Sequence, residues 1–402
     1  MTVSSMELLG LHFDPQFSTS DLHSMHRQFG EQFPAVPAPP LQVHGGKLRI
    51  GYVSGDFYAH ACANFLLPII KTHDRTAFEV FLYSNKIAAD DIVTEQFRRL
   101  GAWRQIHGVD DAAVCAQIAE DKIDILVDCS GHSGGKRMGI FAKRPAPISA
   151  TFLGYPNTTG LTQIDYRLTD DVSDPLIEGN TYATEQLIRL PNGVHTYAPH
   201  ADVDLAYSPT PPFLRKGHVT FGSFNRREKV NDEVLAAWTE ILKAVPGSRL
   251  LLKGDTWRGS PIFTLEYGRV AIMPKTPMLW HHYAAYAEID IALDTFPYNG
   301  TTTTCDALWM GVPVVTFKGD RHAARMTASL LSRMQLDDLI AEDMAGYVAK
   351  AVALATDKSR LAELRRTIRP RFMQSPLGRP EIVTRDLEAF YQKTVRERTS
   401  LP

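Results

Sequence analysis

Short apolar runs alternate with helical segments along most of the chain. In the first half, strand-like runs lie at 48–54, 79–84, 123–129 and 148–154, and helical segments lie at 64–71, 92–100 and 111–120. A second series follows residue 218, with strand-like runs at 219–225, 249–253, 269–273, 289–293 and 312–317 and helical stretches at 232–245, 278–287 and 305–310. Strands separated by helices are typical of a parallel, doubly wound sheet. The pattern therefore predicts an α/β fold with two Rossmann-like domains facing a cleft.

The two ends of the chain depart from this alternation. Residues 20–33 have the pattern of one amphipathic helix, capped by Ser20 or Asp21. The proline-rich segment 34–40 that follows favours a stiff, extended linker. Residues 380–399 predict a long final helix. The sequence thus divides into an N-terminal helix with its linker (1–46), a first Rossmann-like domain (47–200) and a second Rossmann-like domain (201–402).

Composition narrows the class of protein. With 402 residues and 44% hydrophobic content, the chain can bury large cores in two domains. A net charge of −2 argues against a nucleic-acid or membrane-surface binder. No apolar run is long enough for a membrane span, and the N-terminus lacks signal-peptide features. The cysteines fit no zinc or disulfide spacing, which favours a cytoplasmic protein with reduced thiols: Cys62, Cys115, Cys129 and Cys305.

The segment 290–316 carries the clearest chemical signal. An apolar strand ends in Asp294 and runs into a Pro-Tyr-Asn-Gly turn, four threonines (Thr301–Thr304) and the start of a helix. The N-terminus of a helix has unpaired N–H groups and a positive dipole, which suit a phosphate. A threonine there is often only an N-cap, but four in a row exceed what capping needs. The turn therefore predicts a site for a nucleotide diphosphate.

Three further residues of the second half are candidates for the same site. Lys229 lies in the loop after the strand 219–225, and loops at the carboxyl ends of strands bind ligands in open α/β sheets. A cation there can stabilise a pyrophosphate leaving group, although a solvated surface lysine is the alternative. Asp306, expected in the first helical turn, suits either the dipole or ribose hydroxyls. His282 fits either packing or contact with a base.

The first half offers loops at the same edge of its predicted sheet. His60 follows the strand 48–54, where it can act as a general base or hydrogen-bond partner, or simply pack. The loops 130–135 and 154–160 contain His132, Gly154 and Pro156. Asp56 and Asp128 fit capping or turn positions and receive no role. A dinucleotide G-x-G-x-x-G fingerprint and a Walker A motif are both absent from the sequence.

Several long blocks carry a resemblance to a known family: GYVSGDFYAH, IDILVDCSGH, RPAPISATFLGYPNTTGLTQIDYRLTD, VTFGSFNRREKV and DIALDTFPYNGTTTTCDALWMGVPVV. In this order they resemble the catalytic region of the SPINDLY / O-GlcNAc transferase family, from about residue 47 to the C-terminus. The segment 13–33 is similar to the part of the family that joins the tetratricopeptide repeats to the catalytic region. A tetratricopeptide repeat is about 34 residues long, and no repeat with that period is found in the sequence.

The resemblance implies a GT-B architecture and an inverting, metal-independent transfer of a sugar to Ser or Thr hydroxyls of a protein. It implies that Lys229, Thr302 and Thr303 bind the donor diphosphate, Asp306 the ribose and His282 the base, while His60 is the active-site histidine. The first domain would be catalytic and the second would bind the nucleotide sugar. The residues that it assigns to donor binding are His282, Gly300, Thr301, Thr302, Thr303, Asp306, Asn225 and Arg226. Those that it assigns to the sugar and acceptor pocket are Gly154, Pro156 and His132.

Two departures from the family pattern affect the expected chemistry. Thr301 stands where animal O-GlcNAc transferases carry histidine, as in the SPINDLY branch, so GDP-fucose is an alternative to UDP-GlcNAc as donor. The connection between 253 and 270, with Gly259 and Pro261, is short for a helical crossover. The expected partners are a nucleotide sugar and a Ser/Thr-containing protein or peptide, with no cofactor, metal, nucleic acid or membrane, and an oligomer is compatible with the sequence. A nucleotide-sugar-binding module with little catalysis and an epimerase of the same fold are the competing hypotheses.

Overall fold

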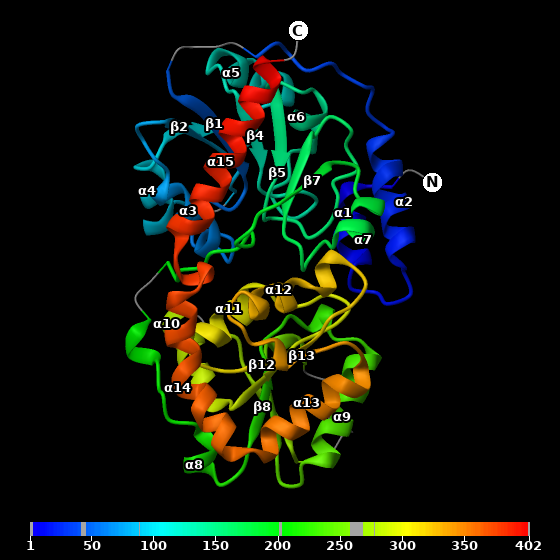
Figure 1. Ribbon diagram of the computed structural model, residues 1–402, viewed down its shortest axis with the longest axis vertical. Helices are drawn as coiled ribbons and strands as arrows, with labels where there is room; N and C mark the ends of the chain where they lie inside the picture. Colours follow the sequence, from blue (N-terminus) through cyan, green and yellow to red (C-terminus); the bar gives the residue numbers. More distant parts are fainter. Residues whose placement is uncertain are drawn as a thin grey trace. The chain divides into compact units, whose positions relative to one another are not determined.

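The computed structural model describes residues 3–41, 46–87, 89–200, 203–257, 268–276 and 278–400. The chain forms two compact units. The first comprises Met1–Leu11, Gln16–His200 and Arg379–Pro402, and the second comprises His12–Pro15 and Ala201–Gly378. Each unit is built around one parallel sheet, so the predicted α/β class is confirmed (Figure 1).

The first unit holds a seven-stranded sheet in the order β3-β2-β1-β4-β5-β6-β7. Its strands are β1 (Leu48–Ser54), β2 (Phe78–Ser84), β3 (Ala102–Gln105), β4 (Ile125–Asp128), β5 (Ile148–Thr151), β6 (Tyr166–Thr169) and β7 (Gln186–Arg189). The central strands are buried on both faces, which explains their nearly continuous apolar sequences. Strands β3, β6 and β7 were not predicted, because their sequences AWRQ, YRLT and QLIR contain no continuous apolar run.

Helices cover both faces of the first sheet. They are α1 (Ser5–Leu11), α2 (Thr19–Gly30), α3 (Ala63–Thr72), α4 (Ile92–Arg98), α5 (Asp111–Glu120), α6 (Met138–Ala142), α7 (Leu176–Thr181) and α15 (Pro380–Thr399). Side chains alternate along β1: Ile50 and Tyr52 join the core cluster that contains α3 and α15, and Val53 joins the cluster that contains α5 and α6. The sheet therefore separates two apolar cores.

The second unit holds a six-stranded sheet in the order β10-β9-β8-β11-β12-β13. Its strands are β8 (Thr220–Ser223), β9 (Arg249–Lys253), β10 (Val270–Met273), β11 (Ile291–Leu293), β12 (Val314–Phe317) and β13 (Ile340–Ala341). Its helices are α8 (Pro212–Lys216), α9 (Asp232–Ala244), α10 (Leu279–Ala284), α11 (Thr302–Trp309), α12 (Met326–Ser332), α13 (Met344–Thr356) and α14 (Lys358–Gln374). Strands β9 and β10 pair in parallel, although Gly259 and Pro261 of the short connection lie outside the described residues.

Strand order reverses once near the middle of each sheet. In the first unit the chain moves outward from β1 through β2 to β3, and then returns to pair β4 with the other side of β1. In the second unit it moves from β8 through β9 to β10 and returns to place β11 beside β8. The crevice beyond the carboxyl ends of strands at such a switch point is where open α/β sheets bind ligands. The loops after β1, β4, β8 and β11 are therefore the places to look for function.

The C-terminal helix corrects the sequence-based division. We assigned 201–402 to the second domain, but α15 belongs to the first unit. Its apolar side packs on α3, with Val383 and Leu387 fully buried in the core beside β1 (Figure 1). The hydroxyls of Tyr391 and Tyr52 lie 3.1 Å apart, so the helix is also held by a polar contact. Periodicity identified the helix but carried no information about which sheet would cover its apolar face.

The N-terminal segment also differs from the prediction. Residues 1–46 are not a separate body, because α1 and α2 pack within the first unit while His12–Pro15 joins the second. Helix α2 is capped by Ser18, not by Ser20 or Asp21. Asp21 instead completes a capping box, accepting hydrogen bonds from the backbone N–H and the hydroxyl of Ser18.

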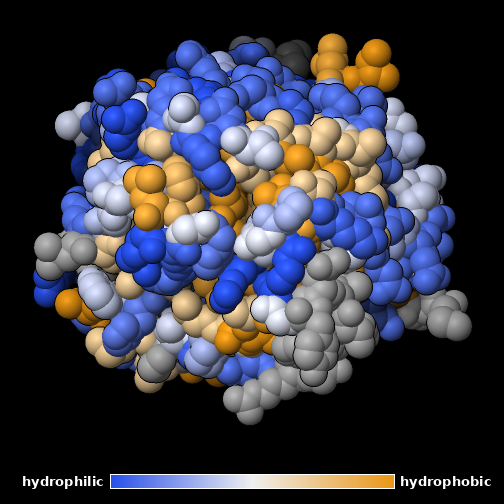
Figure 2. Space-filling view, turned by 90° about the horizontal axis from the view of Figure 1, so that it is seen from below, coloured by the Kyte–Doolittle hydropathy of each residue, from blue (hydrophilic) through white to orange (hydrophobic). Residues whose placement is uncertain are grey.

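No helix within the described ranges is both long and apolar enough to cross a membrane. The face seen in Figure 2 has apolar residues interspersed among hydrophilic ones. Large exposed apolar side chains such as Leu214 and Met373 come from separate elements. Scattered exposed apolar residues are normal on a folded protein and call for no special explanation.

Candidate functional site

A buried aspartate organises the turn that follows β11. Asp294 is 1% exposed and accepts hydrogen bonds from the Gly300 N–H at 2.7 Å and the Thr316 hydroxyl at 2.7 Å. Burial raises the pKa of this carboxyl, and the hydrogen bonds that it accepts, first among them that from Gly300, oppose the rise. The Asn299 side chain donates to the Thr295 carbonyl oxygen at 2.8 Å and closes the turn from within. The backbone that leads into α11 is thus fixed by hydrogen bonds at both ends.

The four threonines at the start of α11 have different roles. Thr301 occupies the N-cap position, but its side chain makes no capping hydrogen bond. The Thr303 hydroxyl donates to Asn225 Oδ1 at 2.9 Å, and the buried Thr304 hydroxyl donates to the Gly300 carbonyl oxygen at 3.2 Å. The hydroxyls of Thr301 and Thr302 are half-buried and have no partner among the described residues. These two hydroxyls, with the first N–H groups of the helix, remain available to an anion.

Gly300 is required by close packing at this turn. A Cβ atom on it would lie 2.5 Å from Thr303 Oγ1 and 2.9 Å from Thr304 Oγ1. Both hydroxyls are held in place by their own hydrogen bonds. Any larger residue would therefore displace the start of α11.

Lys229 lies against the same turn. It ends a short 3₁₀ turn (Arg227–Lys229) after β8, and its Nζ donates to the Asn299 carbonyl oxygen at 2.7 Å. The ammonium also lies 4.3 Å from the centre of the Tyr298 ring. Burial lowers the pKa of Lys229 to about 8, an effect that Asp294 opposes and Arg226 reinforces. The lysine remains largely charged at neutral pH and faces the backbone that precedes the threonines.

Arg226 is placed differently from its neighbour. Its side chain is 69% exposed and lies 3.6 Å from the carboxylate of Glu228. Arg227 instead lies over the ring of Trp257, with 5.3 Å between the guanidinium carbon and the ring centre. Of the basic residues in this loop, Lys229 alone contacts the turn after β11 among the described residues.

A row of polar groups joins α10 to α11. His282 Nε2 lies 3.0 Å from Asp306 Oδ2, and its Nδ1 lies 2.6 Å from Lys253 Nζ. A charged lysine can only donate, so this geometry favours a neutral imidazole that accepts at Nδ1 and donates from Nε2 to the carboxylate. Burial lowers the pKa of Lys253 to about 8, against the opposing effect of Asp306. Asp306 lies in the second turn of α11, which corrects our expectation of the first turn.

A small pocket lies at the switch point of the second sheet. It lies beyond the carboxyl ends of β8 and β11, where Ser223, Asn225, Asp294 and Thr303 line it. Tyr286 closes one wall, and its hydroxyl donates to the Thr303 carbonyl oxygen at 3.2 Å. The pocket shares Asp294 and Thr303 with the turn where Lys229 and the start of α11 offer donors that suit a phosphorylated ligand.

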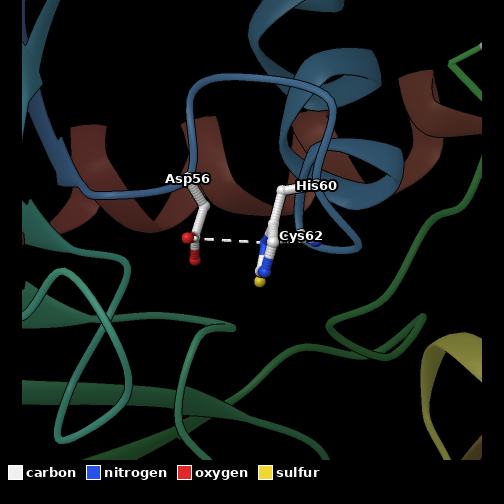
Figure 3. Close-up of side chains that lie close together, drawn as sticks. All are labelled: Asp56, His60 and Cys62. Atoms are coloured by element: carbon white, nitrogen blue, oxygen red, sulfur yellow. Dashed lines mark hydrogen bonds and ion pairs between the residues drawn. The ribbon is translucent and has the colours of Figure 1, made fainter. Parts of the chain in front are cut away.

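In the first unit, the loop after β1 brings three reactive side chains together: Asp56, His60 and Cys62 (Figure 3). His60 Nδ1 lies 3.4 Å from Asp56 Oδ1, and the side chains are 38% and 10% exposed, respectively. Burial raises the pKa of Asp56, against the opposing effects of His60 and Cys62. The sequence analysis identified His60 but assigned no role to Asp56 or Cys62, because neither spacing matches a known motif.

His132 is buried and engaged at both ring nitrogens. Its Nδ1 lies 2.7 Å from the Ser5 hydroxyl and its Nε2 lies 2.8 Å from the Thr159 carbonyl oxygen. Burial lowers the pKa of His132 to about 4, so the ring is neutral at physiological pH. In this structure it joins α1 to the loop 154–160 and offers no free nitrogen to a ligand.

The loop 154–160 is held in place from several sides. Gly154 permits a close approach, because a Cβ there would lie 1.9 Å from the Cys129 carbonyl oxygen. Pro156 is buried. The carboxylate of the buried Glu185 accepts hydrogen bonds from the Thr158 hydroxyl at 2.6 Å and the Thr159 N–H at 2.7 Å. Glu185 lies far from the loop along the chain, so no local sequence pattern identifies it.

The structure thus divides the sequence-predicted residues between the two units. The group in the second unit comprises Asn225, Lys229, His282, Gly300, Thr301, Thr302, Thr303 and Asp306. In the first unit the loops that carry His132, Gly154 and Pro156 lie against each other, and His60 lies in the loop after β1. Lys253 could have been found from the sequence, because it occupies the carboxyl end of a predicted strand beside the switch point.

Most of the chain matches a known family of glycosyltransferases. The model of glycosyl transferase family 41 matches residues 31–200 and 213–387. A probable UDP-N-acetylglucosamine–peptide N-acetylglucosaminyltransferase SPINDLY from Hordeum vulgare is 39% identical over 96% of this chain and 42% of its own length. The protein of the same name from Arabidopsis thaliana is 38% identical over 96% of this chain and 44% of its own length. The chain therefore spans less than half the length of these relatives.

Solved structures agree on the architecture. A mutant O-GlcNAc transferase of Thermobaculum terrenum is 35% identical, with a TM-score of 0.90 over 98% of this chain and 77% of that chain. A sucrose-phosphate synthase of Thermosynechococcus elongatus, only 12% identical, has a TM-score of 0.57 over 87% of this chain and 100% of that chain, a likeness of fold alone. The expected GT-B fold is confirmed. Sequence and architecture agree, and the chain belongs to glycosyl transferase family 41.

Proposed function

We propose that this chain transfers a sugar from a nucleoside diphosphate donor to a Ser or Thr hydroxyl of a protein, with UDP-GlcNAc as the donor. The observation that carries the proposal is the rigid turn after β11, where Lys229 faces a helix start with two uncommitted threonine hydroxyls. The relatives are named as UDP-N-acetylglucosamine–peptide N-acetylglucosaminyltransferases, and the solved bacterial structure as an O-GlcNAc transferase. Because this chain covers only part of those relatives, their activity is a proposal for it.

The second unit would bind the donor. Its diphosphate would lie at the start of α11, with the hydroxyls of Thr301 and Thr302 and the helix N–H groups as donors. Lys229 would exchange its hydrogen bond to the Asn299 carbonyl oxygen for one to a phosphate oxygen. Asp306 would accept from the ribose, and His282, fixed by Lys253 and Asp306, would contact the base.

The reaction needs one bond to form as another breaks. The acceptor oxygen would attack the anomeric carbon of the sugar with inversion, and the bond from that carbon to the diphosphate oxygen would break. The leaving nucleoside diphosphate would carry the developing charge, which Lys229 and the helix donors stabilise without a metal. The hydroxyl proton would pass to a base, and His60, held 3.4 Å from Asp56, is our candidate to receive or relay it.

The donor sugar is tested by comparison of two substrates. Purified protein would be incubated with UDP-GlcNAc or GDP-fucose and a Ser/Thr-containing peptide pool, and release of each nucleotide would be measured. We expect turnover with UDP-GlcNAc that is lost in Lys229→Ala and kept in Lys243→Ala, a lysine that is 56% exposed in α9. Turnover with GDP-fucose alone would assign the alternative donor. Donor binding without turnover of either would reduce the chain to a binding module and overturn the proposal.

The cellular compartment is also a proposal. All four cysteines are free, and free thiols are typical of the reducing cytoplasm. In the cytoplasm the chain would encounter acceptor proteins that have already folded. Fractionation of cells that express a tagged chain would test it, and recovery in a membrane or secreted fraction would contradict it.

A further inference from the structure

The loop after β1 holds three side chains whose ligand atoms lie within 4.8 Å of one another: Asp56, His60 and Cys62. Within the described ranges, no other group of His, Cys, Asp and Glu side chains brings three ligand atoms so close together. Figure 3 shows the three side chains directed to the same side of the loop. We propose that they form a binding site for a thiophilic divalent cation, best matched by Zn²⁺, which blocks His60 when it is bound.

The identity of the donor atoms selects the class of cation. One thiolate sulfur, one imidazole nitrogen and one carboxylate oxygen are all common zinc ligands. Mg²⁺ and Ca²⁺ prefer sets composed of oxygen, so a cysteine and a histidine disfavour them. This set of one sulfur, one nitrogen and one oxygen ligand therefore favours Zn²⁺ over Mg²⁺ and Ca²⁺.

The distances suit tetrahedral coordination. Zinc–ligand bonds are roughly 2.0–2.3 Å long, which puts the ligand atoms of a tetrahedral site roughly 3.3–3.8 Å apart. His60 Nδ1 and Asp56 Oδ1 are already 3.4 Å apart. The remaining spread, up to 4.8 Å, closes with small rotations of the Cys62 and Asp56 side chains. The cation would replace the hydrogen bond that His60 Nδ1 accepts from the Cys62 N–H at 3.3 Å.

The backbone of the loop is fixed before any cation arrives. The Asp56 N–H donates to the Ser54 hydroxyl at 3.0 Å, and the Ala59 N–H donates to Asp91 Oδ2 at 2.8 Å. Cys62 is the N-cap residue of α3, and the carbonyl oxygen of His60 accepts a hydrogen bond from Ala63 at 3.0 Å. Ligands carried by a rigid backbone lose little entropy on binding, which favours affinity.

The charges balance when the thiol loses its proton. In the cation-free site the Cys62 thiol sulfur and an Asp56 carboxylate oxygen lie within 4.8 Å of each other. Binding forms a sulfur–zinc bond and releases that thiol proton to solvent, so that one thiolate and one carboxylate neutralise the two charges of the cation. His60 is 38% exposed, so the fourth coordination position is open to water or substrate.

The consequence for catalysis rests on the function proposed above. A cation bound by both His60 Nδ1 and Asp56 would lie between the two groups and prevent the ring from accepting a proton at that nitrogen. The cation would act as a reversible inhibitor and not as a cofactor, so the proposal is compatible with metal-independent transfer. The sequence predicts no metal at this loop, because the spacing D-x-x-x-H-x-C matches no common zinc motif.

The test measures the cation directly and needs no activity. Untagged protein stripped with a chelator would be titrated with Zn²⁺ against a chromophoric competitor, and with Co²⁺ to record the thiolate-to-cobalt charge-transfer band. Cys62→Ser would be compared with Cys115→Ser, since both cysteines are free and half-buried. Serine is a favourable N-cap, so Cys62→Ser should keep α3 intact, and thermal unfolding would check this.

We expect wild type and Cys115→Ser to bind one equivalent of Zn²⁺ and to show the charge-transfer band. Cys62→Ser should lose the band, with zinc affinity reduced by at least ~100-fold, the upper end of what outer-shell changes cost. Absence of the band in wild type, or unchanged affinity in Cys62→Ser, would overturn the site. In active protein, Zn²⁺ should inhibit wild type and Cys115→Ser, and a chelator should reverse this. A preparation that binds zinc but releases no nucleotide would refute the proposed function and leave the cation site standing.

Discussion

The charge of Lys229 gives the sharpest test of the proposed chemistry. Its pKa is lowered to about 8 by burial, so the free protein should carry the cation at neutral pH and lose it in mildly alkaline solution. With that pKa, the charged fraction is about 90% at pH 7 and about 10% at pH 9. If the ammonium stabilises the leaving diphosphate, kcat/KM should fall about tenfold for each pH unit above 8, because this parameter reports groups of the free enzyme.

The size of the effect follows from what the ammonium contacts. Lys229 makes one charge-assisted hydrogen bond, to the Asn299 carbonyl oxygen, which a phosphate oxygen would replace. Removing one preorganised donor from a developing anion typically costs about 10²–10³-fold in rate. Lys229→Met should therefore lower nucleotide release by that factor at pH 7 and abolish the alkaline fall. Lys229→Arg, whose guanidinium does not deprotonate in this range, should retain part of the rate and stay flat above pH 8.

The measurement is nucleotide release between pH 6.5 and 9.5 at low donor concentration. Lys253 is the necessary control, because burial also lowers its pKa to about 8. Lys253→Met should keep the alkaline fall if Lys229 causes it. A wild-type rate that is constant to pH 9.5, or a Lys229→Met variant with the wild-type rate, would refute the assignment of Lys229 to the leaving group.

Three further substitutions test other parts of the structure. Gly300→Ala places a Cβ 2.5 Å from Thr303 Oγ1 and should weaken donor binding, measured by calorimetry, by at least about tenfold; unchanged affinity would remove the turn from the site. Lys253→Met removes the hydrogen bond to His282 and should raise the donor KM by about tenfold with little change in kcat, whereas a loss confined to kcat would contradict a role in base binding. Tyr155→Phe deletes the 2.7 Å contact to the buried His26 and should lower the free energy of unfolding by about 1–3 kcal/mol in urea titrations; an unchanged midpoint would show that α2 docks without it.

The sequence predicted the elements with strong periodicity and the loops at their ends. Apolar runs identified β1, β4, β8 and β11, and the loops that follow them contain His60, Lys229 and the threonine turn. These predictions succeeded because a parallel strand that is buried on both faces has a continuous run of apolar residues. The direction of the strand then shows which edge of the sheet carries the ligand-binding loops. Family blocks then assigned roles that spacing alone left open.

Local sequence patterns did not predict contacts between residues that are distant along the chain. Glu185 supports the loop 154–160, and α15 covers a sheet whose first strand lies more than three hundred residues earlier. His132 follows a strand at the expected edge, yet its side chain turns inward to Ser5 and Thr159. A local pattern fixes where a residue lies along an element, whereas the partner of its side chain depends on which element packs against it.

The two units use the same device to hold the loops at their switch points. Asp128 ends β4 and accepts hydrogen bonds from the Gly131 N–H at 2.9 Å and the Thr151 hydroxyl at 2.8 Å. Asp294 follows β11 and accepts from the Gly300 N–H and the Thr316 hydroxyl, both at 2.7 Å. In each case the threonine comes from the next strand, the carboxyl is about 1% exposed and burial raises its pKa.

Burying a carboxylate costs free energy, so the presence of one at the edge of each sheet calls for a structural reason. Each aspartate ties the first residues of a glycine-containing loop to the neighbouring strand, so that the loop leaves the sheet in one fixed direction. A neutral side chain of similar size would satisfy fewer of these donors, because a carboxylate alone offers two acceptor oxygens and no competing donor. We therefore interpret Asp128 and Asp294 as the residues that make the two edges rigid enough to position a ligand, and not as groups that take part in the reaction.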